Sequence, residues 1–411
     1  MPGASRDLCI RCKGVKYLCN LSYCPLIHSY KAKISLLKAI DKPEVSGSSP
    51  PSIIIGEKGY PQVMIYYGVP PGIFGNKAKI FDDPYRWFIS RKSLGDIIEY
   101  RSKLIHLAMR INVNKPYILY EKEIGLASLS QKPVDTEAVL KKKPVPRISF
   151  NYITPPRGPS APAKIIKITS NPIIHRRIDK IIWDDVKASE GVWELYKSGV
   201  DFYTIVRAFT LGFIGLRDWR RIVPTRWGIT AVDTILANKM LKEIRCFRLI
   251  NNILVFYGEY LYNKYLIVLS PGKYRGLWIE VWQPRALWNP SETPAYLIVK
   301  ESHNGKVSIM DGGYMAARFS VLEYLYRIKK QAKVLILREV KPQYIIPVGN
   351  WQIRETVKQA LRQGPLLKDP RKHELMDYIK NNFNIPSKLI DLAIEFVYKV
   401  REESLDKWIN K

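Results

Sequence analysis

The chain has 411 residues, of which 46% are hydrophobic, and this predicts a folded protein of two or three domains rather than a disordered one. Its net charge of +29 favours polyanionic partners, with nucleic acid as the first candidate. We find no run of about eighteen apolar residues, so a membrane-spanning protein is not expected. The abundance of Ile, Lys and Tyr suggests a thermophile.

Four of the five cysteines lie within residues 9–24, which read CIRCKGVKYLCNLSYC. The opening residues, MPGASRDL, lack the apolar run of a secretory signal, so we expect a cytoplasmic protein with reduced thiols. The spacing C-x2-C followed by C-x4-C then predicts a structural zinc knuckle within 1–30, against the alternative of four unrelated thiols. The predicted zinc ligands are Cys9, Cys12, Cys19 and Cys24, with His28 as a spare candidate.

Helical spacing follows at 30–40, and strands with tight turns are expected from residue 53 onward. A further helix is predicted over 97–109, where apolar residues recur near a period of 3.6. Residues 131–163 are rich in proline and carry the run Lys141, Lys142, Lys143, which predicts a long basic loop that contacts phosphates. A solvated linker is the alternative for this segment.

Helical patterns resume at 184–195 and 200–209, and the segment RRIVPTRWGITAVD at 220–233 is dense in groups that bind anions. A helix that starts near Thr230 would add free backbone amides to this segment. The alternative is a capped helix in which Thr230 is the N-cap and Asp233 is the acidic residue at position N3 of the first turn. The candidate phosphate or nucleic-acid ligands here are Arg220, Arg221, Thr225, Arg226, Trp227, Thr230 and Asp233.

Strands dominate 246–281, including an expected antiparallel pair in LVFYGEYLYNKYLIVLSPG, and WNPSETP at 288–294 is an expected boundary. A strand at 295–300, a helix after DGG, the strand VLILREV and two helices follow. The last helix is expected to begin at Ser387 and to bury one apolar face.

Two segments of this last third are further candidate sites: DGGYMAARFSVLEYL at 311–325 and PVGNWQIRETVKQAL at 347–361. Glycines before a helix let the backbone approach a ligand, although neither segment is a Walker A loop or a G-x-G-x-x-G fingerprint. A tight turn and ordinary packing are the alternatives. The candidate residues are Gly312, Gly313, Arg318, Trp351 and Arg354.

Catalytic templates are mostly absent, because no H-E-x-x-H or G-x-S-x-G motif occurs and the five histidines are scattered. A two-metal nuclease, which would use Mg²⁺ or Mn²⁺, needs acids gathered from several segments. The sequence therefore leaves open whether the chain is an enzyme.

Four stretches resemble the archaeal Nre family of DNA repair proteins: CIRCKGVKYLCNLSYCP, SPPSIIIGEKGYP, VPTRWGITAVD, and GGYMAARFSVLEYL with REVKPQYIIPVGNWQIRE. The resemblance spans nearly the full length. It implies an N-terminal domain over 31–290, a smaller C-terminal domain over 291–411 and a role in DNA damage repair, with no catalytic residue to carry over. The four cysteines match the cysteine motif of the family, which supports zinc.

Some members of that family end in Q-x-x-L-x-x-F-F, a motif that docks on the sliding clamp (PCNA). The tail EESLDKWINK keeps the spacing but has Glu402 for Gln, and Trp408 and Ile409 for the two aromatics. The candidate clamp-binding residues are Leu405, Trp408 and Ile409. The end of an amphipathic helix would give the same pattern.

We therefore expect an α+β fold with mixed or antiparallel sheets, because strands do not alternate regularly with helices. The expected function is a DNA-repair protein that binds DNA through a basic surface. One alternative is an enzyme acting on nucleic acid or a nucleotide, with a site in 220–233, 311–318 and 349–355. The other is an RNA-binding protein.

Overall fold

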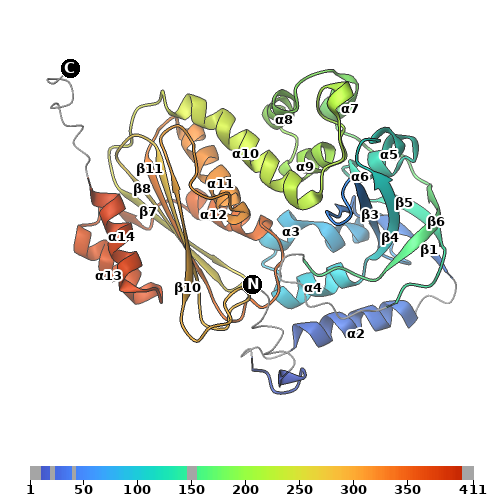
Figure 1. The fold of residues 1–411 in the computed structure, drawn as a ribbon, viewed down its shortest axis with the longest axis horizontal. Helices are drawn as coiled ribbons and strands as arrows, with labels where there is room; N and C mark the ends of the chain where they lie inside the picture. The colour runs from blue at the N-terminus through green and yellow to red at the C-terminus, as the bar shows by residue number, and fades with distance from the viewer. Residues whose placement is uncertain (1–10, 19–23, 39–42, 146–154, 400–411) are drawn as a thin grey trace. The chain divides into compact units, whose positions relative to one another are not determined.

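The computed structural model describes residues 11–18, 24–38, 43–145 and 155–399. The chain forms two compact units, Met1–Lys239 with Ile345–Glu355, and Met240–Tyr344 with Thr356–Lys411. Each unit contains a mixed six-stranded sheet and helices, so the predicted α+β class is confirmed (Figure 1). The predicted domain division at 290 stays a prediction, because a compact unit and a family domain need not coincide.

The sheet of the first unit has the order β1-β5-β6-β4-β3-β2, in which β4 and β6 pair in parallel and the other neighbours are antiparallel. Its strands are β1 (Glu44–Ser49), β2 (Ile53–Ile55), β3 (Gln62–Val69), β4 (Ile105–Asn112), β5 (Val134–Leu140) and β6 (Ser160–Ile168). Alternate residues of β3, from Val63 to Val69, are fully buried, which places the core on one face of this strand.

The first unit also contains helices along the chain before, between and after these strands. They are α2 (Pro25–Lys38), α3 (Pro84–Ile89), α4 (Leu94–Ser102), α5 (Tyr117–Glu121), α6 (Ile124–Ser128), α7 (Arg176–Trp183), α8 (Ala188–Lys197) and α9 (Phe202–Thr210). Two short 3₁₀ helices, η1 (Gly75–Asp82) and η2 (Arg217–Trp219), lie between them in the chain. The helices α10 (Thr225–Ile244) and α12 (Trp351–Gln363) each contain a boundary between the two units.

Two expectations for this unit were wrong. The helix predicted over 97–109 ends at Ser102, and β4 begins at Ile105. The first four residues of β4 are all buried, so the strand lacks the alternation that would have distinguished it from a helix. Within 131–163, residues 134–140 form β5 and β6 begins at Ser160, so the basic loop is shorter than predicted.

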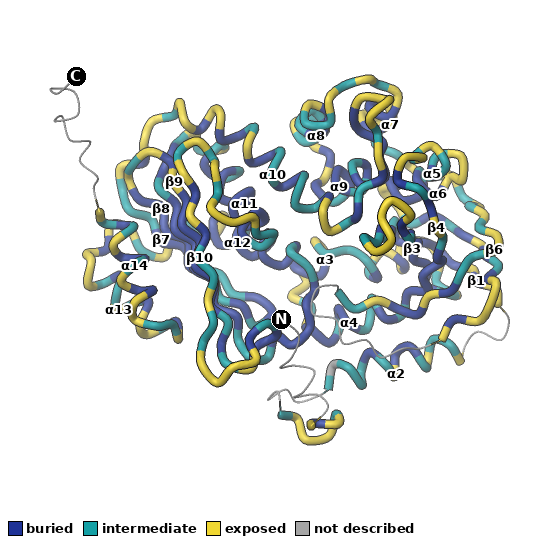
Figure 2. Tube along the Cα trace, viewed as in Figure 1, coloured by how far each residue is buried: buried dark blue, intermediate teal, exposed yellow. Residues whose placement is uncertain are grey.

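The sheet of the second unit has the order β10-β9-β11-β8-β7-β12, with β9 and β11 parallel. Its strands are β7 (Leu254–Tyr260), β8 (Asn263–Ser270), β9 (Arg275–Trp282), β10 (Ala295–Glu301), β11 (Lys333–Val340) and β12 (Leu367–Lys368). The predicted antiparallel pair is confirmed as β7 and β8. Figure 2 shows the central strands of this sheet as buried.

Three further helices belong to this unit: α11 (Gly312–Ile328), α13 (Lys372–Asn382) and α14 (Ser387–Tyr398). The start of α14 at Ser387 is confirmed, and its buried face includes Leu389, Ala393 and Val397. Together with α13, this face packs against apolar residues of β7, β8, β9 and β11. None of the described helices is both long and apolar enough to cross a membrane.

Candidate nucleic-acid interface

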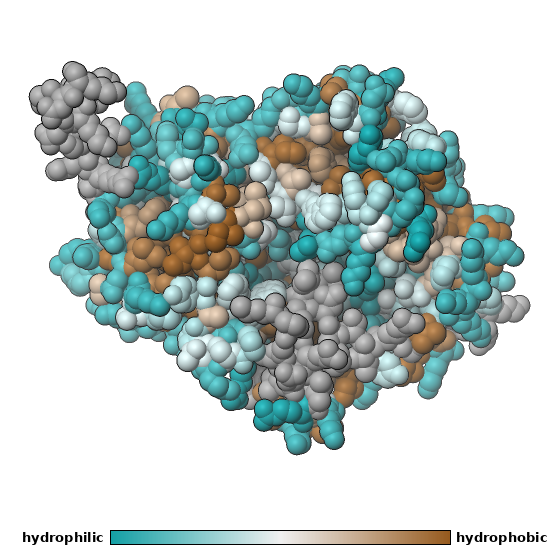
Figure 3. Space-filling model, in the orientation of Figure 1, coloured by the Kyte–Doolittle hydropathy of each residue, from teal (hydrophilic) through white to brown (hydrophobic). Residues whose placement is uncertain are grey.

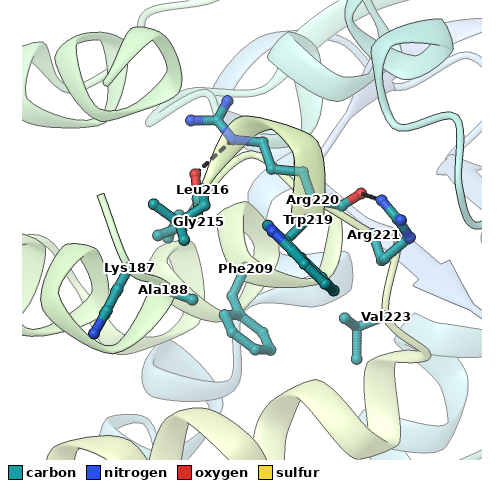
Figure 4. Close-up of a pocket in the computed structure, with 10 residues that line it drawn as sticks. Lys187, Ala188, Phe209, Gly215, Leu216, Trp219, Arg220, Arg221 and Val223 are labelled. Carbon is teal, nitrogen blue, oxygen red and sulfur yellow. Dashed lines mark hydrogen bonds between the residues drawn. The ribbon is translucent and has the colours of Figure 1, made fainter. Parts of the chain in front are cut away.

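A pocket of about 230 Å³ lies where the loop after α9 passes the start of α8 (Figure 4). Its wall combines apolar and basic side chains. The lining residues are Lys187, Ala188, Phe209, Ile214, Gly215, Leu216, Trp219, Arg220, Arg221 and Val223. We call this feature the Trp219 pocket, because the Trp219 side chain is 76% exposed beside it.

The loop that builds the pocket is fixed at both ends by backbone hydrogen bonds. The Val223 amide donates to the Thr210 carbonyl (2.8 Å), and the Ile222 amide donates to the Val113 carbonyl (2.8 Å). Hydrophobic side chains reach the surface over α9, bordered by hydrophilic ones (Figure 3). An exposed indole in such a fixed loop is a pre-formed platform on which a planar ring can stack.

Arg220 supports the loop from inside and does not extend into solvent. Its Nη1 and Nη2 donate to the carbonyls of Ile182 and Asp184 at the end of α7 (2.5 Å each), and its Nε donates to the Gly215 carbonyl (2.9 Å). These bonds satisfy carbonyls that a helix end leaves unpaired. Burial, followed by the charge of Arg217, lowers the pKa of Arg220. We therefore assign Arg220 a structural role in place of the predicted phosphate contact.

Arg221 and Lys187 carry the accessible positive charge of the pocket. Arg221 is exposed, and its Nη1 donates to the carbonyls of Asp218 (3.1 Å) and Arg220 (2.7 Å). Lys187, also exposed, precedes the first residue of α8. In Figure 4 the Trp219 ring lies between Phe209 and Arg221, and the Arg220 guanidinium turns away from it toward Gly215.

The helix that carries the remaining candidates of 220–233 begins earlier than predicted, at Thr225 and not near Thr230. Pro224 immediately precedes it, and the Gly228 amide donates to the Pro224 carbonyl (2.9 Å). Thr230 is therefore an interior residue of α10, where its hydroxyl lies 3.4 Å from the Arg226 carbonyl. The predicted N-cap role of Thr230 was wrong.

At the start of α10, three candidates contact a neighbouring turn of the same unit. The Thr225 hydroxyl accepts from the Ile55 amide (2.8 Å), which covers the edge of β2. Arg226 Nη2 (2.9 Å) and Trp227 Nε1 (3.0 Å) both donate to Glu57 Oε2. Arg226 and Trp227 remain exposed, so they can still meet a ligand, but their polar groups are already shared with a carboxylate.

Asp233 and Arg354 form an ion pair in the interior of the first unit. Their side chains are 0% and 1% exposed, and the Arg354 guanidinium lies 3.9 Å from the centre of the Phe202 ring. Trp351, also predicted as a site residue, is buried and donates to the Val348 carbonyl (2.7 Å). Buried groups of this kind offer nothing to an external phosphate, so these candidates have structural roles.

The candidates of 311–318 lie in the second unit, at the start of α11. Asp311 caps the helix by accepting from the Tyr314 amide (2.7 Å), and Gly312 and Gly313 are its first two helical residues. Arg318 is 2% exposed and donates to Glu301 (2.7 Å), so it does not present a charge at the surface. The glycines stay candidates for close backbone approach, whereas Arg318, also predicted as a phosphate-binding candidate, is buried in its ion pair with Glu301.

Half of the predicted zinc ligands lie within the described residues. Cys12 is buried. Burial opposes its ionisation, but hydrogen bonds from the amides of Leu18, Gly14, Lys16 and Tyr17 outweigh it and lower the pKa of the thiol. A Cβ placed on Gly14 would lie 3.6 Å from the sulfur of Cys24. Amides directed at a sulfur in a turn fit a metal-bound thiolate.

Several other predicted residues lie outside the described residues. They are Cys9 and Cys19, and the clamp-binding candidates Leu405, Trp408 and Ile409. Among the residues that are described, no group of three metal-binding side chains occurs, which is expected when two of four cysteines are missing from the set. Lys141, Lys142 and Lys143 are described and exposed, directly after β5.

Three residues of the pocket surroundings were not predicted: Lys187, Arg217 and Trp219. The segment LRDWRR did carry a signal, because an aromatic residue between arginines is typical of surfaces that bind unpaired bases. Lys187 lies thirty-two positions before Trp219 in the chain. Only the fold of α7, α8 and α9 brings it to the same pocket.

Comparison with known proteins identifies relatives along nearly the whole chain. The archaeal Nre N-terminal family model matches residues 18–289, and the archaeal Nre C-terminal model matches residues 300–408. The chain is 35% identical to DNA repair protein NreA of Archaeoglobus fulgidus over 87% of this chain and 89% of that protein. It is 33% identical to DNA repair protein NreB of the same organism, over 85% and 87% of the two chains. No solved structure matches.

Proposed function

This chain belongs to the archaeal Nre family, and we propose that it acts in DNA repair by binding unpaired DNA bases at the Trp219 pocket. The repair role is supported by the names of its relatives from Archaeoglobus fulgidus and Haloferax volcanii, the latter 30% identical over 76% of this chain. The site is proposed from the exposed Trp219 ring and the basic side chains beside it.

The exposure of Trp219 beside a fixed pocket is the observation that carries this proposal. Stacking of one base on an aromatic ring contributes about 1–3 kcal/mol and is largely independent of sequence. A pocket of about 230 Å³ is smaller than the roughly 300–1,000 Å³ of most small-molecule sites. It therefore suits one base better than a whole dinucleotide cofactor.

The basic residues at the pocket would hold the sugar–phosphate backbone that enters with the base. Arg221 and Lys187 are exposed and lie on opposite sides of the apolar wall. The net charge of +29 would attract a polyanion from a distance and would make the affinity dependent on salt. Lys141, Lys142 and Lys143 are further candidates for such nonspecific phosphate contacts.

We also propose that Cys9, Cys12, Cys19 and Cys24 hold a structural zinc ion. The turn after Cys12 supports this, because its amides stabilise a thiolate at Cys12 and its Gly14 approaches Cys24. Four thiolates would close the coordination sphere, so the ion would cross-link the N-terminal segment and take no part in a reaction.

The proposed base-binding site is tested by fluorescence anisotropy with labelled single-stranded DNA. Trp219→Ala removes the stacking surface and should weaken binding by about tenfold, which corresponds to roughly 1.4 kcal/mol. Trp183→Ala is the matched control, since Trp183 is 56% exposed and does not line the pocket. Equal affinities of Trp219→Ala and the wild type would rule out the pocket.

The same assay separates the alternative functions. Duplex DNA should bind more weakly than the single strand, and RNA of matched sequence that binds tighter than DNA would favour an RNA-binding protein. Denaturing gels of samples incubated with Mg²⁺ or Mn²⁺ show whether strands are cut. Cleavage that survives in Trp219→Ala would indicate an enzyme with its active site elsewhere.

A further inference from the structure

A second group of basic side chains lies inside the first unit, around His106 on β4. His106 is 1% exposed, and within the described chain neither of its ring nitrogens has a hydrogen-bond partner. Arg157, Arg101 and Lys33 are the charges that act on it there. We call these four residues the His106 cluster. Buried polar nitrogens without partners are uncommon in folded proteins and require an explanation.

The sheet places a row of small and polar residues on the face that carries His106. Gly68 of β3 and Ser160 of β6 are the direct partners of His106 on either side, and Ser52 follows next to Gly68. Residues directly opposite each other in neighbouring strands share a face. The direct strand partners of His106 on this face are therefore small residues.

The Arg157 guanidinium lies on the same face of the sheet, where it stacks on the ring of Tyr66. Tyr66 lies two residues before Gly68 in β3, so both face the same side of the sheet. The Tyr66 ring meets the His106 ring edge-on with centroids 6.4 Å apart, and the Arg157 guanidinium lies 4.1 Å from the centre of the Tyr66 ring. The backbone amide of His106 also bonds the Pro159 carbonyl (2.9 Å), which fixes the segment that carries Arg157.

Two packed helices supply the other two cations. Ser29 of α2 and Ser102 of α4 are joined by a buried hydrogen bond of 2.7 Å between their hydroxyls. Lys33 follows Ser29 by one helical turn, and Arg101 directly precedes Ser102. Lys33 is only 8% exposed, and burial followed by the charge of Arg157 lowers its pKa.

The positive charge of the cluster exceeds its described negative charge. Asp82 accepts from Arg101 Nη2 (3.3 Å), while the buried Nε of Arg101 has no hydrogen-bond partner among the described residues. The buried ring nitrogens of His106 and the Nε of Arg101 lack partners among the described residues, and an anion that accepts from them would satisfy these groups. A phosphate group fits, because its oxygens accept from guanidinium, ammonium and imidazole donors at once.

We propose that the His106 cluster binds a phosphate group. The proposal rests on Lys33, Arg101, His106 and Arg157, none of which lines the Trp219 pocket. It is therefore independent of the function proposed above and can hold or fail by itself. The phosphate could be inorganic phosphate or the terminal phosphate of a nucleic acid, and these sources are separated by experiment.

The first measurement is thermal unfolding of the full chain in inorganic phosphate, compared with chloride at equal ionic strength and pH 7. A ligand that binds the folded state raises the unfolding temperature in a saturable way. We expect such a rise in phosphate. An unfolding temperature that is the same in both salts would overturn the proposal.

Variants then locate the binding. Arg157→Gln removes an exposed guanidinium without opening the core and should weaken phosphate binding about tenfold, since charge-assisted bonds are the strong ones. His106→Gln tests whether the buried imidazole contributes to phosphate binding. If this variant does not fold, the phosphate affinity of Arg157→Gln still tests the proposal. Arg285→Gln, at an exposed arginine outside both proposed sites, is the matched control and should keep the wild-type response. An unchanged response in Arg157→Gln would overturn the assignment.

Competition identifies the source of the phosphate. Inorganic phosphate binding is measured by calorimetry in the presence of an oligonucleotide with a 5′-phosphate, or of the same oligonucleotide with a 5′-hydroxyl. Competition by the phosphorylated form alone supports a site for nucleic-acid ends. Persistence of phosphate binding with both oligonucleotides supports a site for the free ion. If Arg157→Gln binds inorganic phosphate as tightly as the wild type under every one of these conditions, the proposed site is ruled out.

Discussion

Arg354 and Asp233 form a two-point ion pair in the interior of the first unit, with Nη2 2.6 Å from Oδ2 and Nε 3.1 Å from Oδ1. The two residues are separated by 121 positions in the chain. The pair joins α10 to the start of α12, and the neighbouring Tyr203 hydroxyl donates to Glu355 (2.7 Å). This arrangement serves folding, because no solvent reaches either charge.

Substitution of Asp233 is predicted to affect stability rather than chemistry. Asp233→Asn removes the carboxylate charge that pairs with the buried Arg354 guanidinium and should lower the free energy of unfolding by about 3–5 kcal/mol. The exposed pair of Arg226 and Glu57 provides the control, since Glu57→Gln should lower the free energy of unfolding by at most about 1 kcal/mol. Urea unfolding measures both. A stable Asp233→Asn protein that loses activity on DNA would instead make Asp233 catalytic.

The second unit has a comparable centre at Glu301. This side chain is 0% exposed and accepts from Arg318 (2.7 Å) and from the hydroxyls of Tyr274 (2.9 Å) and Tyr314 (2.5 Å). Glu301→Gln should therefore destabilise the protein by about 3–5 kcal/mol.

The control for Glu301 is Glu292→Gln, because Glu292 is 75% exposed and pairs with Arg285 at the surface. Glu292→Gln should lower the free energy of unfolding by at most about 1 kcal/mol. Thermal and urea unfolding of the two variants give the comparison. Equal losses in both would show that the buried network contributes no more than a surface pair.

Acid should destabilise the first unit through His106. Burial, followed by the charges of Arg157, Arg101 and Lys33, lowers the pKa of His106 to about 3. The unfolded chain, with a histidine pKa near 6.5, binds a proton that the folded chain does not bind between these values. Stability should then be highest above pH 6.5 and fall as pH drops toward 3, by up to about 1.4 kcal/mol per pH unit.

His106→Gln should flatten this dependence, because it removes the titrating group. Unfolding free energies between pH 4 and 7.5 in the wild type and the variant test the prediction. A variant whose pH profile parallels that of the wild type would assign the acid sensitivity to other groups.

Metal removal is predicted to act on the N-terminal segment. The purified chain should contain about one zinc ion, and a strong chelator should lower its unfolding temperature. Cys12→Ser and Cys24→Ser should lose the metal, whereas Cys246→Ser should keep it, since the fifth cysteine is exposed and lies in the second unit. Metal analysis of the three variants is the measurement. Full zinc content in Cys12→Ser would contradict the assignment.

The sequence predicted the elements whose pattern is local. The hairpin of β7 and β8 was found because apolar runs flank a turn, and α14 because its apolar residues repeat at helical spacing. The strand β4 was missed because its buried residues do not alternate. The start of α10 was misplaced because Pro224, rather than a hydroxyl side chain, precedes its first turn.

The site was harder to predict, because its members are selected by tertiary structure. Arg220, Arg221, Arg318 and Arg354 look alike in the sequence, yet of these four only Arg221 is exposed. The others are bonded to a helix end or to a buried carboxylate, and the partners lie far away in the chain. Neither composition nor spacing indicates which arginine will meet such a partner.

The most direct test of the central claim is the salt dependence of single-stranded DNA binding by the wild type and by Arg221→Gln. If Arg221 contacts a phosphate, the logarithm of the affinity should fall linearly with the logarithm of salt, and the variant should show a slope smaller by about 0.7. Arg285→Gln, in the second unit, should keep the wild-type slope. An affinity that does not change with salt, or an unchanged slope in Arg221→Gln, would contradict the account.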